Sequence, residues 1–312
     1  MTNQPFLQEV ENDSGLNNLK STQDWLKENK IFIELKLEEH GAIIFKDLPV
    51  KTAEDFDQFV STFNYETFTY EESLSNAVRI NKTDKVFTAN EAPREVEIFL
   101  HHEMAQTPTY PKNIFFFCKS ASETGGETPL CRSDQLYEAL LKADKALVES
   151  FEKFGVIYNS IMSSGDELIS GQGRSWQKTL GVSSKNDAEE KLSKLGYSWN
   201  WIEDDNLSVT TKTLQATKEL GNGQKSFFNQ VIAASLGWKK NSENQIAPVR
   251  FGNGEEIKGS YIELISELAQ SLTLLRSWQD HDILLIDNYR VMHGRKPFAG
   301  NKNREVLVSL TN

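Results

Sequence analysis

Hydrophobic residues recur with a helical period near the start of the chain and form shorter, strand-like runs after it. Between Leu16 and Lys36 the apolar residues Leu16, Leu19, Trp25, Leu26 and Ile31 have a helical spacing, which predicts a helix. Residues 40–49 (HGAIIFKDLP) form a β-branched run closed by turn residues, which predicts a strand. Residues 52–63 place aromatic side chains on one face behind Thr52 and two acidic residues, which is typical of a capped surface helix.

The rest of the pattern places strands toward both ends of the chain and helices in the middle. Short apolar runs bounded by polar, Gly or Pro residues predict strands at 77–80, 85–89, 96–103, 113–119, 282–288 and 305–310. Residues 132–154 predict a helix that opens on a Ser/Asp cap. Gly, Ser and Asn interrupt the region 160–270. We expect one domain over residues 1–312, with an insertion of helices and loops at about 135–270 and a sheet that the C-terminal strands complete.

Composition narrows the class of partner. The 312 residues are 38% hydrophobic and 25% charged, as in ordinary globular proteins. A net charge of -11 argues against a broad nucleic-acid or anionic-membrane surface, because phosphate contacts need clustered Lys and Arg. The chain begins without a secretory pattern, and no apolar run approaches the roughly 20 residues that span a bilayer. We therefore expect a cytoplasmic protein with small-molecule partners, and the sequence gives no indication of its oligomeric state.

Two cysteines, Cys118 and Cys131, are too few for a disulfide scaffold or a Cys-based metal site. Free cysteines usually behave as small hydrophobic residues. We expect both to be buried and inert, with a local disulfide as the less favoured alternative.

Residues 97–108 (EIFLHHEMAQTP) contain the first candidate metal ligands. If the strand continues through 103, alternate side chains point to opposite faces, so His101 and Glu103 share one face and His102 lies on the other. Hydrophobicity does not decide which face is inward. The pair of interest is therefore His101 and Glu103, with His102 expected in the core.

A third ligand has to come from a distant part of the chain, and the sequence holds only five histidines. We choose His293, which follows the predicted strand 282–288 in a turn rich in Gly and Arg. Two histidines and one carboxylate on one face of Fe(II) leave positions open for O2 and a bidentate cosubstrate. On spacing alone, a chance His-x-Glu sequence stays open as the alternative.

Residues 99–140 and 287–310 resemble the Fe(II)/2-oxoglutarate-dependent oxygenases of the TauD/TfdA superfamily, especially the branch near clavaminate synthase and the syringomycin-type biosynthetic oxygenases. The similarity extends over most of residues 35–312. It implies a mainly β fold with α-helices, in which a double-stranded β-helix (jelly roll) is surrounded by helices and holds the metal inside its open end.

The resemblance also implies a set of site residues. It makes His101, Glu103 and His293 the iron ligands, and Arg304 with Thr128 the residues that hold the far carboxylate of 2-oxoglutarate. A planar guanidinium suits this task because it pairs with a carboxylate through two charge-assisted hydrogen bonds. Halogenating relatives have a small residue where this chain has Glu103, so halogenation is not expected.

The implied reaction is oxidation of an unactivated C–H bond with Fe(II), 2-oxoglutarate and O2, by hydroxylation, desaturation or oxidative cyclisation. The branch implies a small amino-acid-like substrate, free or carrier-bound, in specialised metabolism. Nearness in sequence to the metal motifs makes four residues candidate substrate contacts: Arg290, Arg79, Asn90 and Gln106. Two alternatives are a cupin-like isomerase or hydrolase that does not use 2-oxoglutarate, and a non-enzymatic binding module.

Overall fold

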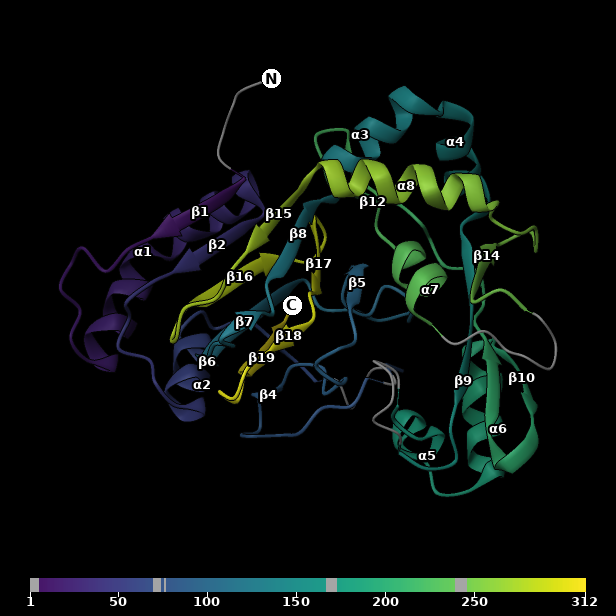
Figure 1. The fold of residues 1–312 in the computed structure, drawn as a ribbon, viewed down its shortest axis with the longest axis horizontal. Coiled ribbons are helices and arrows are strands. Elements are labelled where there is room, and N and C mark those ends of the chain that lie inside the picture. The colour runs from purple at the N-terminus through teal and green to yellow at the C-terminus, as the bar shows by residue number, and fades with distance from the viewer. Residues whose placement is uncertain (1–5, 70–73, 76, 167–172, 239–245) are drawn as a thin grey trace.

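The computed structural model describes residues 6–69, 74, 75, 77–166, 173–238 and 246–312. The chain has a mixed α/β fold in which two β-sheets lie against each other and helices cover their outer faces (Figure 1). Within the described part, no helix is long and apolar enough to cross a membrane.

The large sheet combines strands from the first 120 residues of the chain with two strands near its C-terminus. In spatial order it contains β1 (Leu7–Val10), β2 (Ala42–Phe45), β16 (Ile283–Asp287), β6 (Asn113–Ser120), β19 (Glu305–Thr311) and β3 (Thr67–Phe68), with β4 (Phe87–Thr88) also paired to β19. The C-terminal strands β16 and β19 flank β6, so they complete this sheet as predicted.

The small sheet is antiparallel and carries the chemistry described below. In spatial order it contains β15 (Thr273–Arg276), β8 (Thr128–Arg132), β17 (Val291–Arg295) and β5 (Ile98–His101). An apolar layer joins the two sheets, since Leu130 and Val291 of the small sheet cluster with Ile44 and Ile286 of the large one.

The large sheet is buried on both faces, which explains why its strands are apolar at consecutive positions. On β2, Ile44 packs toward the small sheet, whereas Ile43 and Phe45 pack toward helices α1 (Leu19–His40) and α2 (Ala53–Ser61). Figure 1 shows both helices on the outer side of this sheet. The two helices were predicted, and their packing fixes the sheet that supports the site.

Residues at the helix ends account for where α1 and α2 begin and stop. The Asn18 side chain accepts a hydrogen bond from the first turn of α1, and Gly41, with φ of 80°, ends that helix in the left-handed conformation. Thr52 and Asp55 form a reciprocal capping box at the start of α2, as the Thr52 pattern predicted.

The middle of the chain covers the outer face of the small sheet. Its helices are α3 (Ser133–Ala143), α4 (Lys145–Phe154), α5 (Trp176–Leu180), α6 (Lys185–Leu195), α7 (Val231–Gly237) and α8 (Gly259–Ser271), with the short 3₁₀ helix η2 (Glu203–Asp205). Buried side chains of α3, α4, α7 and α8 cluster with Cys131 and Met292 on the small sheet. Both cysteines are buried and free, as expected.

The prediction of one helix over 132–154 is wrong. Asp144 has an extended φ of -153°, which ends α3, and its side chain accepts a hydrogen bond from the Leu147 N–H to start α4. The expected Ser/Asp cap is also absent, because α3 has no side-chain cap hydrogen bond.

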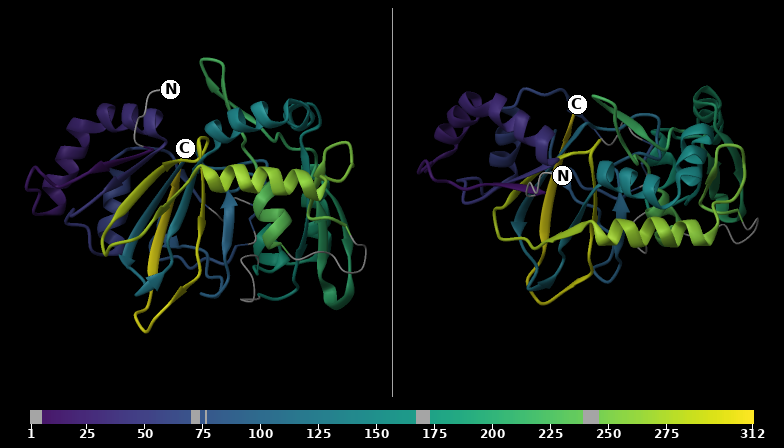
Figure 2. Two further views of the ribbon diagram at one scale, coloured as in Figure 1. Left: turned by 45° about the horizontal axis from the view of Figure 1, so that its top comes forward. Right: turned by 90° about the horizontal axis from the view of Figure 1, so that it is seen from above.

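The remaining strands form smaller sheets, and Figure 2 shows two further views of the whole arrangement. A four-stranded sheet contains β10 (Ser198–Trp201), β11 (Leu207–Thr210), β9 (Val156–Met162) and β14 (Val249–Phe251). Two pairs complete the set: β12 (Lys218–Gly221) with β13 (Gln224–Ser226), and β7 (Thr124–Gly125) with β18 (Phe298–Ala299). The strand predicted at 77–80 is not a named strand, although this segment is hydrogen-bonded to residues 88–91.

Candidate metal centre

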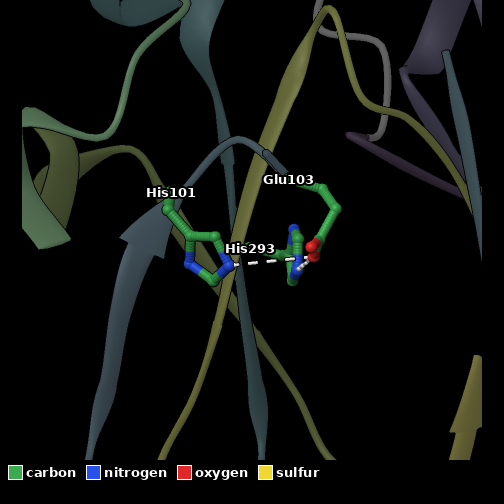
Figure 3. A group of neighbouring side chains, drawn as sticks. All are labelled: His101, Glu103 and His293. Carbon is green, nitrogen blue, oxygen red and sulfur yellow. Dashed lines mark ion pairs between the residues drawn. The ribbon is translucent and has the colours of Figure 1, made fainter. Parts of the chain in front are cut away.

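Three candidate ligands, from the end of β5, the turn after it and β17, converge at one point, as Figure 3 shows. His101 ends β5 and lies opposite His293 of β17 in the strand register, with ring centroids 4.4 Å apart. Oε2 of Glu103 is 3.5 Å from Nε2 of His293 and 4.0 Å from Nε2 of His101. One ligand atom from each residue lies within 4.8 Å of the others. The structure therefore brings together the three residues that the sequence singled out.

Glu103 reaches this point by a different route from the one predicted. Strand β5 ends at His101, so strand alternation does not place Glu103, and the chain turns through Met104, which has a positive φ of 59°. The Asn288 side chain holds the turn: its Oδ1 accepts the Glu103 N–H at 2.8 Å, and its Nδ2 donates to the Glu103 carbonyl at 3.1 Å and to the Pro111 carbonyl at 2.8 Å. Sequence reasoning missed Asn288.

His293 lies within a strand, so its predicted place in a turn is wrong. The sequence around His293 indicates a turn because of Gly294, but this glycine instead allows β17 and β5 to lie close together. A Cβ at Gly294 would lie 2.4 Å from the Ile98 carbonyl oxygen. The pairing of the two strands also has an irregular register between His293 and Arg295.

The His101 ring is held in the form that a metal requires. Its Nδ1 is 2.7 Å from the Phe99 carbonyl oxygen and donates to it, which leaves the Nε2 lone pair directed at the other ligands. Burial, together with the nearby His293, lowers the pKa of His101 to about 4 against the opposing effect of Glu103. The ring is therefore neutral near pH 7.

Glu103 is ionised although it is buried. Burial alone raises the pKa of its carboxyl, but Arg79 and His293 outweigh this effect, and the pKa lies well below its usual value. Nη2 of Arg79 donates to Oε1 of Glu103 at 2.8 Å, and both side chains are only 6% exposed. The centre thus presents two imidazoles, of which His101 is neutral, and one carboxylate.

The neighbouring His102 belongs to the core, as predicted. It is fully buried, its Nδ1 donates to the Asn288 carbonyl at 2.5 Å, and its ring packs on Phe228 at 4.6 Å between centroids. Burial lowers the pKa of His102 to about 3. The structure therefore pairs His101, and not His102, with Glu103.

A cavity opens at the three ligands and gathers most of the other predicted site residues. Its polar lining includes the ligands together with Thr128, Arg304, Arg79, Asn90 and Gln106. Apolar side chains, among them Phe99, Phe116 and Trp238, line the remainder. The Oε1 atom of Gln106 is buried without a hydrogen-bond partner in the described part of the chain.

Arg304 is a buried cation, and the protein supplies few hydrogen-bond acceptors to its N–H groups. Its Nη2 donates to the Gly126 carbonyl at a long 3.3 Å, and its Nε has no partner. Among the described residues no carboxylate pairs with it, and burial lowers its pKa. A Cβ at Gly126, which has φ of 73°, would lie 2.9 Å from Nε of Arg304, so only glycine allows this approach.

Thr128 lies on the same cavity and is held by a residue that the sequence did not indicate. The indole N–H of Trp278 donates to Oγ1 of Thr128 at 2.9 Å, across 150 positions of sequence. The hydroxyl proton of Thr128 is then left to donate elsewhere. Arg304 and Thr128 thus offer donors to an anion within the cavity.

Arg295 also lines the cavity, and its role is to hold the segment above it. Its guanidinium donates to the carbonyls of Ala92, Pro93 and Val96 at 2.6 to 3.0 Å. These bonds fix the backbone from Ala92 to the cavity-lining Val96.

Arg290, by contrast, is not among the residues that line the cavity. Its guanidinium lies 3.2 Å from Asp287 and 4.0 Å from Asp134, and it is 6% exposed. The structure does not bring Arg290 to the three candidate ligands, so its predicted substrate contact has no support in this geometry.

The donor set fits a first-row divalent metal such as Fe(II). Two imidazoles with one carboxylate are the donor set of the facial arrangement known for non-haem iron, and a metal that they held would lie at the cavity. A fully protein-ligated structural site would need a further ligand. Within the part of the chain that the structure describes, His101, Glu103 and His293 are the group of His, Cys and acidic residues whose ligand atoms lie close enough together to bind one metal ion.

Comparison with known proteins agrees with this geometry. The family model described as "Taurine catabolism dioxygenase TauD, TfdA family" matches residues 7–310. The clavaminate synthase-like protein At3g21360 of Arabidopsis thaliana is 32% identical over 286 residues, which cover 91% of this chain and 86% of that protein. The dapdiamide synthesis protein DdaC of Enterobacter agglomerans is 28% identical over 289 residues, which cover 88% and 83%.

Solved structures share the fold at low sequence identity. The PvcB protein of Pseudomonas aeruginosa has a TM-score of 0.55 at 13% identity, covering 99% of this chain and 87% of that one. AAD-2, in complex with Mn(II) and N-oxalylglycine, has a TM-score of 0.52 at 14% identity, covering 91% and 87%. The resemblance read from residues 99–140 and 287–310 is confirmed, and the chain belongs to the TauD/TfdA family of dioxygenases.

Proposed function

We propose that the chain uses His101, Glu103 and His293 to bind Fe(II) and oxidises a C–H bond of a small amino-acid-like substrate with 2-oxoglutarate and O2. Membership of a dioxygenase family supports the enzyme class and does not favour a cupin-like enzyme without 2-oxoglutarate or a binding module. The observation that carries the proposal is the convergence of three ligand atoms within 4.8 Å at the cavity that also contains Arg304.

When bound, the iron supplies O2 activation coupled to the decarboxylation of 2-oxoglutarate, and the products are succinate, CO2 and an oxidised substrate. The chain itself supplies two imidazoles and an ionised carboxylate as metal ligands. Phe116 packs edge-on against His293 at 5.2 Å between ring centroids, and it shields this ligand from water. The protein's work is to position the reactants and exclude solvent.

Arg304 and Thr128 are the proposed binding residues for the far carboxylate of 2-oxoglutarate. The support is the poorly paired guanidinium of Arg304, since a buried N–H group without an acceptor costs about 1–3 kcal/mol. A carboxylate would accept from Arg304 and from the hydroxyl that Trp278 orients on Thr128.

We assign Asn90 and Gln106 to the substrate side of the cavity. The unpaired acceptor on Gln106 suits an N–H donor such as an amine or amide, which agrees with an amino-acid-like substrate. One relative is named for dapdiamide synthesis, which is consistent with this class of compound. The oxidation would be a hydroxylation, a desaturation or a ring closure.

The architecture we propose is a single domain built on a double-stranded β-helix. The two facing sheets would be its two walls, with the metal ligands at one open end. Residues from about 135 to 270 would be an insertion packed on the small sheet. The apolar layer shared by the two sheets supports this assignment.

The test is succinate formation from 2-oxoglutarate in the presence of Fe(II) and O2, with a panel of amino-acid-like compounds. We expect release that depends on both Fe(II) and a stimulating compound, and none from Glu103→Ala. A cupin-like enzyme would act on its substrate without 2-oxoglutarate. A binding module would give no succinate with any compound.

A further inference from the structure

We infer that Arg79 is a positioning residue that restricts Glu103 to one-oxygen coordination of the metal. The inference rests on the proposed metal site, and it gives Arg79 a role other than the substrate contact suggested by its sequence position. It follows from how the two oxygens of Glu103 are divided between neighbours.

Each oxygen of the Glu103 carboxylate faces a different partner. Oε1 accepts a hydrogen bond from Nη2 of Arg79 at 2.8 Å. Oε2 faces the imidazoles, at 3.5 Å from Nε2 of His293 and 4.0 Å from Nε2 of His101. One oxygen is therefore already engaged by a buried cation, and the other is directed at the metal position.

Arg79 is held firmly enough to keep this division. Thr88 and Glu91 donate backbone hydrogen bonds to the carbonyls on either side of Arg79, at 2.9 and 3.1 Å. The guanidinium carbon lies 5.2 Å from the ring centroid of Phe87, a cation–π distance. Only 6% of the Arg79 side chain is exposed, so solvent cannot readily replace Glu103 as its partner.

The division of the two Glu103 oxygens matters because it determines how many coordination positions on the metal stay open. In a six-coordinate centre, two imidazoles and one oxygen leave about three open positions, enough for a bidentate cosubstrate and O2. A Glu103 bound through both oxygens would leave about two, which the cosubstrate alone would fill. To bind in that way, Glu103 would have to turn Oε1 toward the metal, which would distort its charge-assisted hydrogen bond to Arg79, one of the stronger kinds in proteins.

Two substitutions separate positioning from a purely structural role. Arg79→Lys keeps a cation and a donor of similar reach, whereas Arg79→Met keeps the bulk and removes both. If Arg79 positions Glu103, the Met variant frees the second oxygen and removes a repelling charge, so it should bind a divalent metal more tightly than the wild type. If Arg79 only supports the fold, the same variant should bind metal less tightly.

The experiment counts water molecules on Mn(II) bound to the protein without 2-oxoglutarate, by magnetic resonance in ¹⁷O-labelled water. We expect about three waters for the wild type and for Arg79→Lys, and about two for Arg79→Met, with a lower Kd for Mn(II). The matched control is Arg290→Met, which removes a buried arginine away from the cavity and should keep about three waters.

Three waters on Arg79→Met, or two on the wild type, would overturn the inference. If Arg79→Met does not fold, Arg79→Leu, which also removes the cation and its donors, takes its place with the same expected count. A wild type that binds no Mn(II) would overturn the proposed function, and that failure is distinct because it appears before any water is counted.

Discussion

Strands β8 and β17 of the small sheet have buried polar groups near both ends. The two ends differ in whether these groups are paired with other groups of the protein. At the end near Arg132 and Arg290, the guanidiniums pair with Asp134 and Asp287. At the other end, the ligand carboxylate and imidazoles face a cavity, and Arg304 has an unpaired Nε. Both ends are buried, so burial of charge alone does not mark a site.

The difference lies in whether the protein satisfies its own polar groups. Paired charges such as Arg132 with Asp134 complete each other and need nothing from outside. Unpaired donors and acceptors carry a free-energy cost that a ligand can remove. The end with Arg304 can therefore bind an anion and a metal cation, whereas the opposite end only holds strands and helices together.

The largest effect is expected from the metal ligands. His293→Ala should abolish Fe(II) binding and reduce succinate formation to background, because two ligands cannot hold the ion in this geometry. The control is His102→Asn, whose amide can still donate to the Asn288 carbonyl. We expect this variant to keep metal binding, measured by anaerobic titration; the opposite pattern would mean that the wrong histidine has been assigned.

The comparison would fail if Arg290, and not Arg304, were needed to bind 2-oxoglutarate. Arg304→Lys should raise the Kd of 2-oxoglutarate about a hundredfold, on the order of 2–3 kcal/mol, and leave Mn(II) affinity unchanged. Arg290→Lys should leave the Kd of 2-oxoglutarate unchanged and lower the free energy of unfolding by about 1–3 kcal/mol. Calorimetry and denaturant titration of both variants measure these quantities. Equal effects on 2-oxoglutarate would contradict the assignment of Arg304.

Asn288 should link stability to metal affinity, with an intermediate effect. Asn288→Ala removes three buried hydrogen bonds, to the Glu103 N–H, the Glu103 carbonyl and the Pro111 carbonyl. We expect about a tenfold loss of Mn(II) affinity and a loss of about 2–4 kcal/mol in the free energy of unfolding. An unchanged affinity in a folded variant would show that Glu103 is placed without Asn288.

The smallest effect is expected from Thr128. Thr128→Val keeps the shape of the side chain and removes one hydroxyl, so the Kd of 2-oxoglutarate should rise only a few-fold, by about 0.5–1.5 kcal/mol. Trp278→Phe removes the donor that orients this hydroxyl and should give a smaller change in the same direction. An effect of Thr128→Val as large as that of Arg304→Lys would sharpen the comparison by making the hydroxyl an equal partner.

The sequence predicted the parts of the fold that depend on local patterns. The apolar runs of β2, β6, β16 and β19 and the capped α2 were found where expected, because burial on both faces and capping leave local signals. The break at Asp144 was missed, since the apolar spacing of a helix continues across it. Strand β17 was missed because Gly294, which allows close approach to β5, reads as a turn residue.

The site residues that lie in short sequence motifs could be predicted, and the residues that support them from distant parts of the chain could not. His101, Glu103 and Arg304 lie in such motifs, whereas Asn288 and Trp278 act on residues 185 and 150 positions away. The sequence could not show that Arg290 lies away from the cavity, because this depends on the acidic partners that the fold supplies. Glu103 was identified through strand alternation, although the strand ends before it.

The most direct test of the account is an anaerobic titration of the wild-type protein with Fe(II) and then 2-oxoglutarate, followed by absorption spectroscopy. The account predicts a metal-to-ligand charge-transfer band that needs both additions, because it places the cosubstrate on the same ion as His101, Glu103 and His293. Fe(II) binding without such a band at saturating 2-oxoglutarate would contradict it.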